Sequence, residues 1–242
     1  MLPWNADDLA FDESTFSGVG RLFPLPNLVM FPHVMQPLHI FEQRYRTMLN
    51  EALDSDGLLA MGVVTGDFES ERPPVCPHVC LGKVVTHHRL DDGRYNVLLL
   101  GMRRARIVSE LPDDRPFRRA ELELLDDFAP TAGDDDRAEL QRELTERFGE
   151  SLQGSALVDE AIRSFLSDEA PLGVLTDLVS FAAPLGLEEK CALLAEGNVD
   201  RRAKLLNRWL RSHAKGASTQ PPAPKFAAQK SSLRFPPRFS SN

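Results

Sequence analysis

The chain has 242 residues, 42% hydrophobic and 26% charged, which suits one large or two small soluble domains with a full core. Its net charge is −8, and residues 215–242 hold five basic residues and no acid, so the first 214 residues carry −13. So acidic a body would repel phosphate groups, which disfavours nucleic acid as the main partner. The sequence lacks a run of about 18 apolar residues, so we expect no membrane span. The N-terminus lacks a basic targeting segment, and three cysteines suit a reducing compartment, so we expect a cytoplasmic protein.

Residues 20–52 combine a proline-rich segment with a helical pattern, after an acidic and flexible arm at residues 1–19. Four prolines, at positions 24, 26, 32 and 37, fall within 14 residues, and each biases the residue before it toward extended backbone. Together with the apolar residues between them they predict a short strand and a buried, irregular crossing. Helical spacing follows, with an apolar face made of Phe41, Tyr45, Met48, Leu49 and Ala52.

Residues 58–125 show the patterns of β-strands. We expect strands at residues 58–64, 81–90, 95–108 and 117–125, with Asp91-Asp92-Gly93 as the turn of a hairpin. Gly101 interrupts the third of these strands and is expected to mark a bulge or a bend. Residues 20–128 are therefore predicted to form a β-rich unit.

Residues 133–213 change to helical spacing. Apolar residues at every fourth position from Leu140 to Leu152 predict one helix, and similar patterns predict others near residues 157–166, from Pro171, at 187–194 and after a cap at Asn198. The composition of residues 214–242 predicts a disordered basic tail. The fold class is therefore α+β, with a β-rich unit followed by a helical unit.

Three pieces of the N-terminal half carry a specific resemblance. The sequence reads FPLP at residues 23–26, FP at 31–32 and PLHIFEQRYRTM at 37–48. In this order and spacing it closely resembles the opening of the substrate-binding domain of ATP-dependent Lon proteases. Residues 79–107 and 175–194 resemble later segments of the same family, so the resemblance covers residues 20–213. It implies a small PUA-like β-barrel with one or two helices, followed by a bundle of four to five helices.

Two catalytic modules of full-length Lon have no counterpart in this sequence. The phosphate loop G-x-x-x-x-G-K-[ST] is absent, as is the Ser–Lys protease domain. We therefore expect a stand-alone, non-catalytic module without a cofactor that recognises proteins or peptides. Its expected partners are unfolded or apolar protein segments, or a protein such as an ATP-dependent protease, for which it would act as an adaptor in proteolysis or quality control.

The candidate protein-binding residues lie between Pro26 and Pro37. Flexible methionines beside rigid proline and phenylalanine suit varied apolar partners, which selects Met30, Phe31, Val34 and Met35. Burial of these side chains in the core is the slightly favoured interpretation, and a binding role requires that they be exposed. The structural motif of the family resemblance corresponds to Pro37, His39, Phe41, Glu42, Arg44 and Tyr45.

One cluster has residue types that bind zinc. Cys76, His78 and Cys80, with His87 or His88 nearby, offer thiolates and imidazoles, and a metal-assisted hydrolase built on them is the alternative function. Their spacing lacks the second ligand pair of a structural zinc site, so small apolar fillers of a strand are the stronger interpretation. A redox pair of Cys76 and Cys80 is not indicated either, because the C-x-x-C spacing is absent.

Two further groups of polar residues admit two interpretations each. His33, His39 and Glu42 suit acid–base chemistry, but we favour a structural role in which His39 and Glu42 tie the crossing to the helix. A basic cluster at Arg103, Arg104 and Arg106, with Arg118 and Arg119 further on, is compatible with RNA binding. Pairing with acids on neighbouring strands is the favoured role of these arginines.

Overall fold

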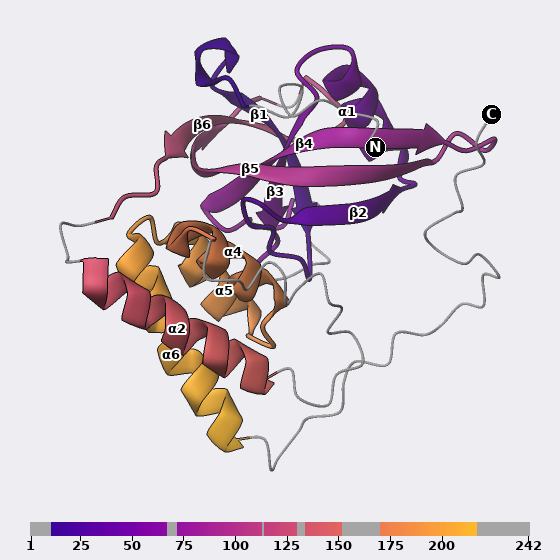
Figure 1. Cartoon of the computed structure of the whole chain (residues 1–242). Helices are drawn as coiled ribbons and strands as arrows, with labels where there is room; N and C mark the ends of the chain where they lie inside the picture. Colours follow the sequence, from indigo (N-terminus) through magenta and orange to yellow (C-terminus); the bar gives the residue numbers. More distant parts are fainter. Residues whose placement is uncertain (1–10, 67–71, 113, 130–133, 152–169, 217–242) are drawn as a thin grey trace, which may run out of the picture.

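The computed structural model of the chain describes residues 11–66, 72–112, 114–129, 134–151 and 170–216. Strands and helices are mixed, which confirms the α+β class (Figure 1). The helix expected near 157–166 lies outside the described residues, as do residues 217–242 of the predicted tail, whereas residues 214–216 are helical. The strands are β1 (Val19–Leu25), β2 (Met35–Ile40), β3 (Leu58–Val63), β4 (His78–Arg89), β5 (Tyr95–Glu110) and β6 (Arg119–Leu125). The helices are α1 (Gln43–Leu53), α2 (Asp134–Ser151), α4 (Leu172–Ala182), α5 (Leu187–Ala195) and α6 (Val199–Gly216), and a short 3-10 helix, η2 (Glu13–Thr15), precedes β1.

The six strands form one sheet whose pairing closes on itself. The order is β2-β5-β4-β3-β1-β6, and β6 also pairs with β5, so that β5, β4, β3, β1 and β6 make a closed ring. Only the β1–β3 pair is parallel among the pairs of named strands. Strand β5 pairs with β4 along one edge, while its other edge pairs first with β2 (residues 95–100) and then with β6 (residues 104–110).

Gly101 lies where the edge of β5 passes from β2 to β6. Its N–H donates to the Val34 carbonyl at 2.8 Å, and its own carbonyl accepts the His33 N–H at 2.8 Å. The register of β4 and β5 shifts beside it, between the pairs made by Leu81 and Gly82, which confirms the expected bulge. The proline-rich crossing, which is the segment between β1 and β2 (residues 26–34), is therefore fixed by backbone hydrogen bonds to the middle of β5.

Two hydrophobic clusters occupy the two faces of the strands. The smaller takes residues from all five strands of the ring, as the inside of a closed sheet requires, namely Leu22, Ala60, Val79, Leu81, Ala105, Ala120 and Leu122. The larger packs the opposite face, with residues such as Phe23, Leu59 and Leu99, against α1 and the later helices. Alternation along β1, β3, β4 and β5 therefore places side chains in both clusters.

Helix α1 confirms four of the five residues of the predicted apolar face and corrects one. Tyr45, Met48, Leu49 and Ala52 are buried, whereas the side chain of Phe41 is 60% exposed. The helix begins only at Gln43, because Glu42 has extended backbone as the N-cap residue. Phe41 therefore lies between the end of β2 at Ile40 and the start of the helix, outside the helical period.

The four later helices lie on one side of the sheet (Figure 1). Asn198 caps α6 as expected, since its Oδ1 accepts the Arg201 N–H at 3.0 Å. The larger hydrophobic cluster joins residues of α2, α4, α5 and α6 to residues of the strands. Because the predicted β-rich and helical units share this core, their boundaries at 20–128 and 133–213 stay a prediction.

A buried ionic cluster also joins the helices to the sheet. Arg104 of β5 donates to the Asp177 carboxylate of α4, and Arg202 of α6 lies on the other side of that carboxylate, 3.6 Å away. Asp127, after β6, accepts from Arg202 Nη1 at 3.0 Å. Among the described residues, none of the helices has the length and apolar character that crossing a membrane requires.

Gly101→Ala tests the fixed crossing. The added Cβ would lie 2.0 Å from the Phe31 carbonyl oxygen, so the backbone must move. We expect the free energy of unfolding to fall by about 2–3 kcal/mol in urea titrations. The matched control is Gly149→Ala in α2, where nothing lies within 4 Å of the added atom and where the free energy of unfolding should rise by up to about 1 kcal/mol. Equal effects of the two changes would contradict the role given to Gly101.

Candidate functional site

A groove with a cavity volume of about 690 Å³ lies beside the proline-rich strand β1. Its lining comes from four separated segments, which are the end of β1, the start of α1, the connection after β3 and the residues before β6. The lining residues are Pro24, Leu25, Pro26, Glu42, Arg44, Tyr45, Val64, Arg72, Pro73, Arg115, Pro116, Phe117 and Arg118. Four arginines and one glutamate thus surround a lining that is otherwise prolines, aromatics and aliphatics.

Tyr45 anchors the apolar part of this groove. It is buried, its ring centroid lies 4.6 Å from that of Phe23, and its hydroxyl has a pKa raised by burial. The Arg44 guanidinium carbon lies 4.7 Å from the centre of the same ring, as in a cation–π contact. Arg44 also pairs with Glu42 at 2.8 Å. The family motif residues Glu42, Arg44 and Tyr45 therefore all line the groove.

Glu110 holds two of the groove arginines in place. Its carboxylate accepts from Arg118 Nε at 3.0 Å and from Arg72 Nη2 at 2.6 Å. The bond from Arg118 is the largest influence and lowers the pKa of Glu110, against an opposing effect of burial, and the bond from Arg72 lowers it further. Arg118 also donates to the Pro73 carbonyl at 2.7 Å, which ties the connection after β3 to the residues before β6.

The groove offers two kinds of contact to a bound ligand. Its described lining residues include no Ser, Thr, Cys or His that would serve as a nucleophile. Apolar side chains of a ligand can contact Tyr45 and the prolines, while guanidinium groups can donate to its carboxylates or carbonyls. Sequence reasoning missed Arg72 and Arg115 and considered Arg118 only as part of a basic cluster. The available signal was the repeated Arg-Pro pair, at residues 72–73 and 115–116.

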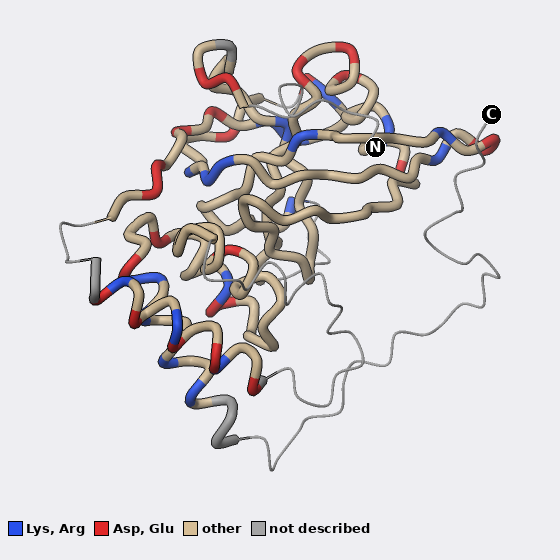
Figure 2. Tube along the Cα trace, viewed as in Figure 1, with Lys and Arg blue, Asp and Glu red and all other residues tan. Residues whose placement is uncertain are grey.

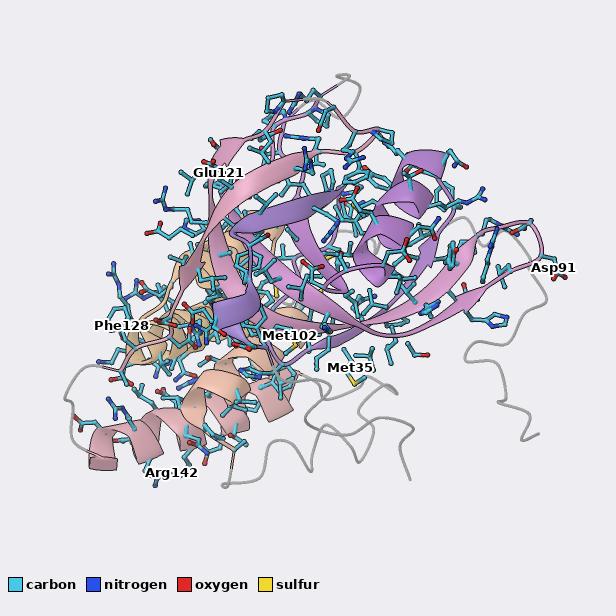
Figure 3. All side chains as sticks on the ribbon, turned by 90° about the horizontal axis from the view of Figure 1, so that it is seen from above. Met35, Asp91, Met102, Glu121, Phe128 and Arg142 are labelled. Atoms are coloured by element: carbon cyan, nitrogen blue, oxygen red, sulfur yellow. The ribbon has the colours of Figure 1, made fainter. Side chains whose placement is uncertain are left out.

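The four predicted protein-binding residues are divided by the structure. Met30, Phe31 and Val34 are buried in the larger hydrophobic cluster, so the predicted binding role, which requires exposure, is wrong for them. The crossing is pinned to β5 at Gly101, which directs these side chains into the core. Met35 is 44% exposed and points away from the sheet in Figure 3, so a binding role stays a prediction for it.

Strand β2 and the residue after it present a row of exposed side chains. Met35, Pro37, His39 and Phe41 are exposed at alternate positions. In the sheet β2 pairs with β5 alone. Pro37 lacks an N–H, and the Gln36 side chain donates to the Pro37 carbonyl at 2.8 Å, so the backbone of this edge offers few groups to another strand.

The predicted metal cluster does not assemble. Across the part of the chain that the structure describes, no group of three or more Cys, His, Asp or Glu side chains is placed to hold a metal ion. Cys80 is buried in the core, while Cys76 lies 3.1 Å from Cys191, sulfur to sulfur. Burial, and then Arg106, lower the pKa of His78. His87 is exposed near the end of β4, so the alternative of a metal-assisted hydrolase has no support.

The basic cluster on β5 is neutralised by acids, and Figure 2 marks the basic and acidic positions along the trace. Arg106 donates to Glu123 on the adjacent strand β6, which confirms the expected cross-strand pairing, while Arg103 donates to Asp126 after β6 and Arg104 to Asp177 of α4. Arg118 and Arg119 contact Glu110 and Asp114 in the same way. RNA binding through these arginines is therefore unsupported.

His33, His39 and Glu42 are held apart by different partners. His39 Nδ1 lies 2.7 Å from Asn96 Oδ1, and Glu42 accepts from Arg44 at 2.9 Å. His33 Nε2 lies 3.9 Å from the Asp177 carboxylate. The three do not form an acid–base site. The structural role expected for His39 and Glu42 also differs, because both contact side chains at the surface instead of buried backbone.

Comparison with known proteins points to one family. The family model described as the ATP-dependent protease La (LON) substrate-binding domain matches residues 20–212. The chain is 28% identical over 195 residues to Lon protease 2 of Desulfotalea psychrophila, an alignment that covers 76% of this chain and 24% of the relative. It is 27% identical over 195 residues to Lon protease of Escherichia coli K12, covering 79% and 24%. The chain thus spans about a quarter of the length of these relatives.

Two solved structures share the fold. The N-terminal domain of Lon protease from the Mycobacterium avium complex superposes with a TM-score of 0.63 at 19% identity, over 81% of this chain and 99% of that one. The Lon N-terminal domain protein of Xanthomonas campestris gives a TM-score of 0.59 at 18% identity, over 79% and 98%.

Glu110→Gln tests the ionic support of the groove by its pH dependence. Because the folded pKa of Glu110 is lowered, the stability it contributes is present above its ordinary pKa and is lost as pH falls through the folded value. The variant should therefore be less stable than wild type by about 1 kcal/mol or less at pH 7, and the difference should vanish between about pH 5 and 3. Urea unfolding at several pH values measures this.

Glu123→Gln is the matched control for this series, since Glu123 pairs with Arg106 away from the groove. Arg72 and Arg118 should lose order only in the Glu110 variant, as followed by NMR of their side-chain N–H groups. A stability difference that stays constant from pH 7 to 3 would contradict the ionic role of Glu110.

Proposed function

Since its residues 20–212 match the family model, the chain belongs to the Lon substrate-binding domain family, and on that premise we propose that it binds exposed segments of other proteins without altering them chemically. Homology to this domain supports a substrate-recognition module. The observation that carries the proposal at the level of residues is the groove, where an apolar lining is combined with four arginines.

The groove favours protein segments of a particular kind. The four lining prolines and Leu25 are partly or largely exposed and offer an apolar contact surface to leucine or aromatic side chains, whereas Tyr45 and Phe117 are themselves buried. Arg44 and Arg115 have side chains about half exposed, at 50% and 49%, and so can reach a carboxylate on the ligand. Segments with an apolar side chain next to Asp or Glu fit both features.

The partner of this recognition step is part of the same proposal. The matched relatives are named Lon proteases, so bound segments would be passed to an ATP-dependent protease, with this domain acting as an adaptor. The three cysteines are free thiols, in keeping with a reducing cytoplasm. The closed ring of five strands is compatible with the expected PUA-like barrel, and we keep that finer fold assignment as a proposal.

Peptide binding tests the groove. Fluorescence anisotropy compares three labelled synthetic peptides. The first has Phe and Leu flanked by Asp, the second has Phe and Leu flanked by Lys, and the third has Ser in place of Phe and Leu but keeps the flanking Asp. We expect the first to bind most tightly. Arg44→Glu combined with Arg115→Glu should weaken its binding roughly tenfold or more, because two attractive charges become repulsive.

The control is Arg106→Glu, which reverses an equally exposed arginine outside the groove and should change the affinity by less than about twofold. Thermal unfolding confirms that each variant is folded. Equal binding by all three proteins would remove the groove as the site, and loss of binding in Met35→Asp instead would assign the site to β2. If no peptide binds to wild type, protein recognition by this chain is contradicted.

A further inference from the structure

We propose that Cys76 and Cys191 form a site of reversible oxidation at which a low-molecular-weight disulfide converts the two thiols into an internal disulfide. Both are free, and their Sγ atoms lie 3.1 Å apart. A disulfide bond is about 2.05 Å long, so the two sulfurs need to approach by only ~1 Å. The pair is independent of the groove and of the proposed function.

The two backbones that carry these thiols are held by separate contacts. The Cys76 N–H donates to the Val63 carbonyl at 2.8 Å, which fixes it beside β3 just before β4 begins. Cys191 lies on α5, whose first turn is capped by the bond from the Gly186 N–H to Glu189 at 2.9 Å. Lys190 Nζ donates to the Phe181 carbonyl of α4 at 2.6 Å, so α5 is also tied to its neighbour. The short distance therefore joins two ordered elements.

Access separates this pair from the third cysteine. Cys76 and Cys191 are partly exposed, whereas Cys80 is fully buried and its thiol pKa is raised by that burial. Because thiol–disulfide exchange needs a thiolate that a reagent can reach, Cys80 is protected in the folded protein. The reactive pair is therefore Cys76 and Cys191, which are close in space and partly exposed, and not Cys76 and Cys80, which are close only in sequence.

The chemistry proceeds in two balanced steps with glutathione disulfide as the oxidant. Burial and the adjacent Cys76 raise the pKa of Cys191 to about 12, so Cys191 stays a neutral thiol at first. The Cys76 thiolate attacks one sulfur of glutathione disulfide, forms a mixed disulfide and releases a glutathione thiolate. Once Cys76 is in the mixed disulfide, its thiol no longer raises the pKa of Cys191, and the released glutathione thiolate takes the Cys191 proton. The Cys191 thiolate then attacks Cys76 Sγ, forms the internal bond and releases a second glutathione thiolate. Two protein thiols are oxidised and one glutathione disulfide is reduced.

The bond would join the strand-bearing half of the chain to its helices. Cys76 and Cys191 are 115 residues apart in sequence, so the link closes a long loop and restricts the unfolded chain. We expect the oxidised protein to unfold roughly 5–15 °C above the reduced protein. Oxidation would also fix α5 to the start of β4, and a reducing thiol would release it.

The test uses the full-length protein, reduced and then equilibrated in buffers with increasing ratios of oxidised to reduced glutathione. Remaining thiols are alkylated, and intact-mass and peptide mass spectrometry locate the bonds. The expected product has lost two hydrogen atoms, contains a peptide pair joined through Cys76 and Cys191, and reverts with dithiothreitol. Cys80 should be alkylated only after unfolding.

Three variants separate this product from other outcomes. Cys76→Ser and Cys191→Ser should each form no internal bond and show no rise in unfolding temperature on oxidation, while Cys80→Ala should behave as wild type. Circular dichroism confirms that each is folded. Bonds that involve Cys80, bonds only between two chains, or a stable mixed disulfide on wild-type Cys76 would each overturn the proposal.

Discussion

The buried carboxylate of Asp177 and the two guanidinium groups on either side of it determine how the helices lie on the sheet. Asp177 and Arg202 have no exposed side-chain surface, and Arg104 is 2% exposed. Removing such charges from water is costly, and this cost is offset only when each charge meets an opposite charge with good geometry. Burial alone would lower the pKa of Arg104, but the carboxylates of Asp177 and Asp127 raise it above its ordinary value, so its guanidinium stays charged. Strand β5, the residue after β6, α4 and α6 must therefore come together in one arrangement.

The same region places the groove through a chain of backbone contacts. Gly101 fixes the crossing three residues before Arg104 on β5, and His33 of that crossing lies near Asp177. The crossing leads into β2 and then into α1, whose first turn supplies Arg44 and Tyr45 to the groove. His33 has a positive φ of 65°, an uncommon conformation for a residue other than glycine, which marks how tightly the crossing is constrained. The groove thus depends on the contacts that hold this segment to β5.

Local periodicity was enough to predict most of the elements, because strands and helices bury side chains at fixed intervals. Strands β3 to β6, the hairpin turn at Gly93, the bulge beside Gly101 and the cap at Asn198 follow from residues that are near one another in sequence, whereas strand β2 was not predicted within the proline-rich segment. The groove did not follow, because Arg72 and Arg118 meet at Glu110 only through the sheet topology. The burial of Met30 and Phe31 was only slightly favoured for a related reason. An apolar segment beside prolines has the same composition at a surface as in a core, and only the contact with Gly101 decides between them.

The closed ring of strands has a consequence for synthesis of the chain. Val19 of β1 pairs with Glu121 of β6, about 100 residues later, so the ring is incomplete until the second strand has left the ribosome. At ordinary rates of about 5–20 residues per second, this interval lasts roughly 5–20 s. Over that time the nascent chain carries an unpaired β1 edge, which is open to association with other chains. Pro24 is the last residue but one of that strand and Pro26 directly follows it, and neither has the N–H group that a foreign strand would use. The proline-rich segment therefore also protects the nascent chain against aggregation.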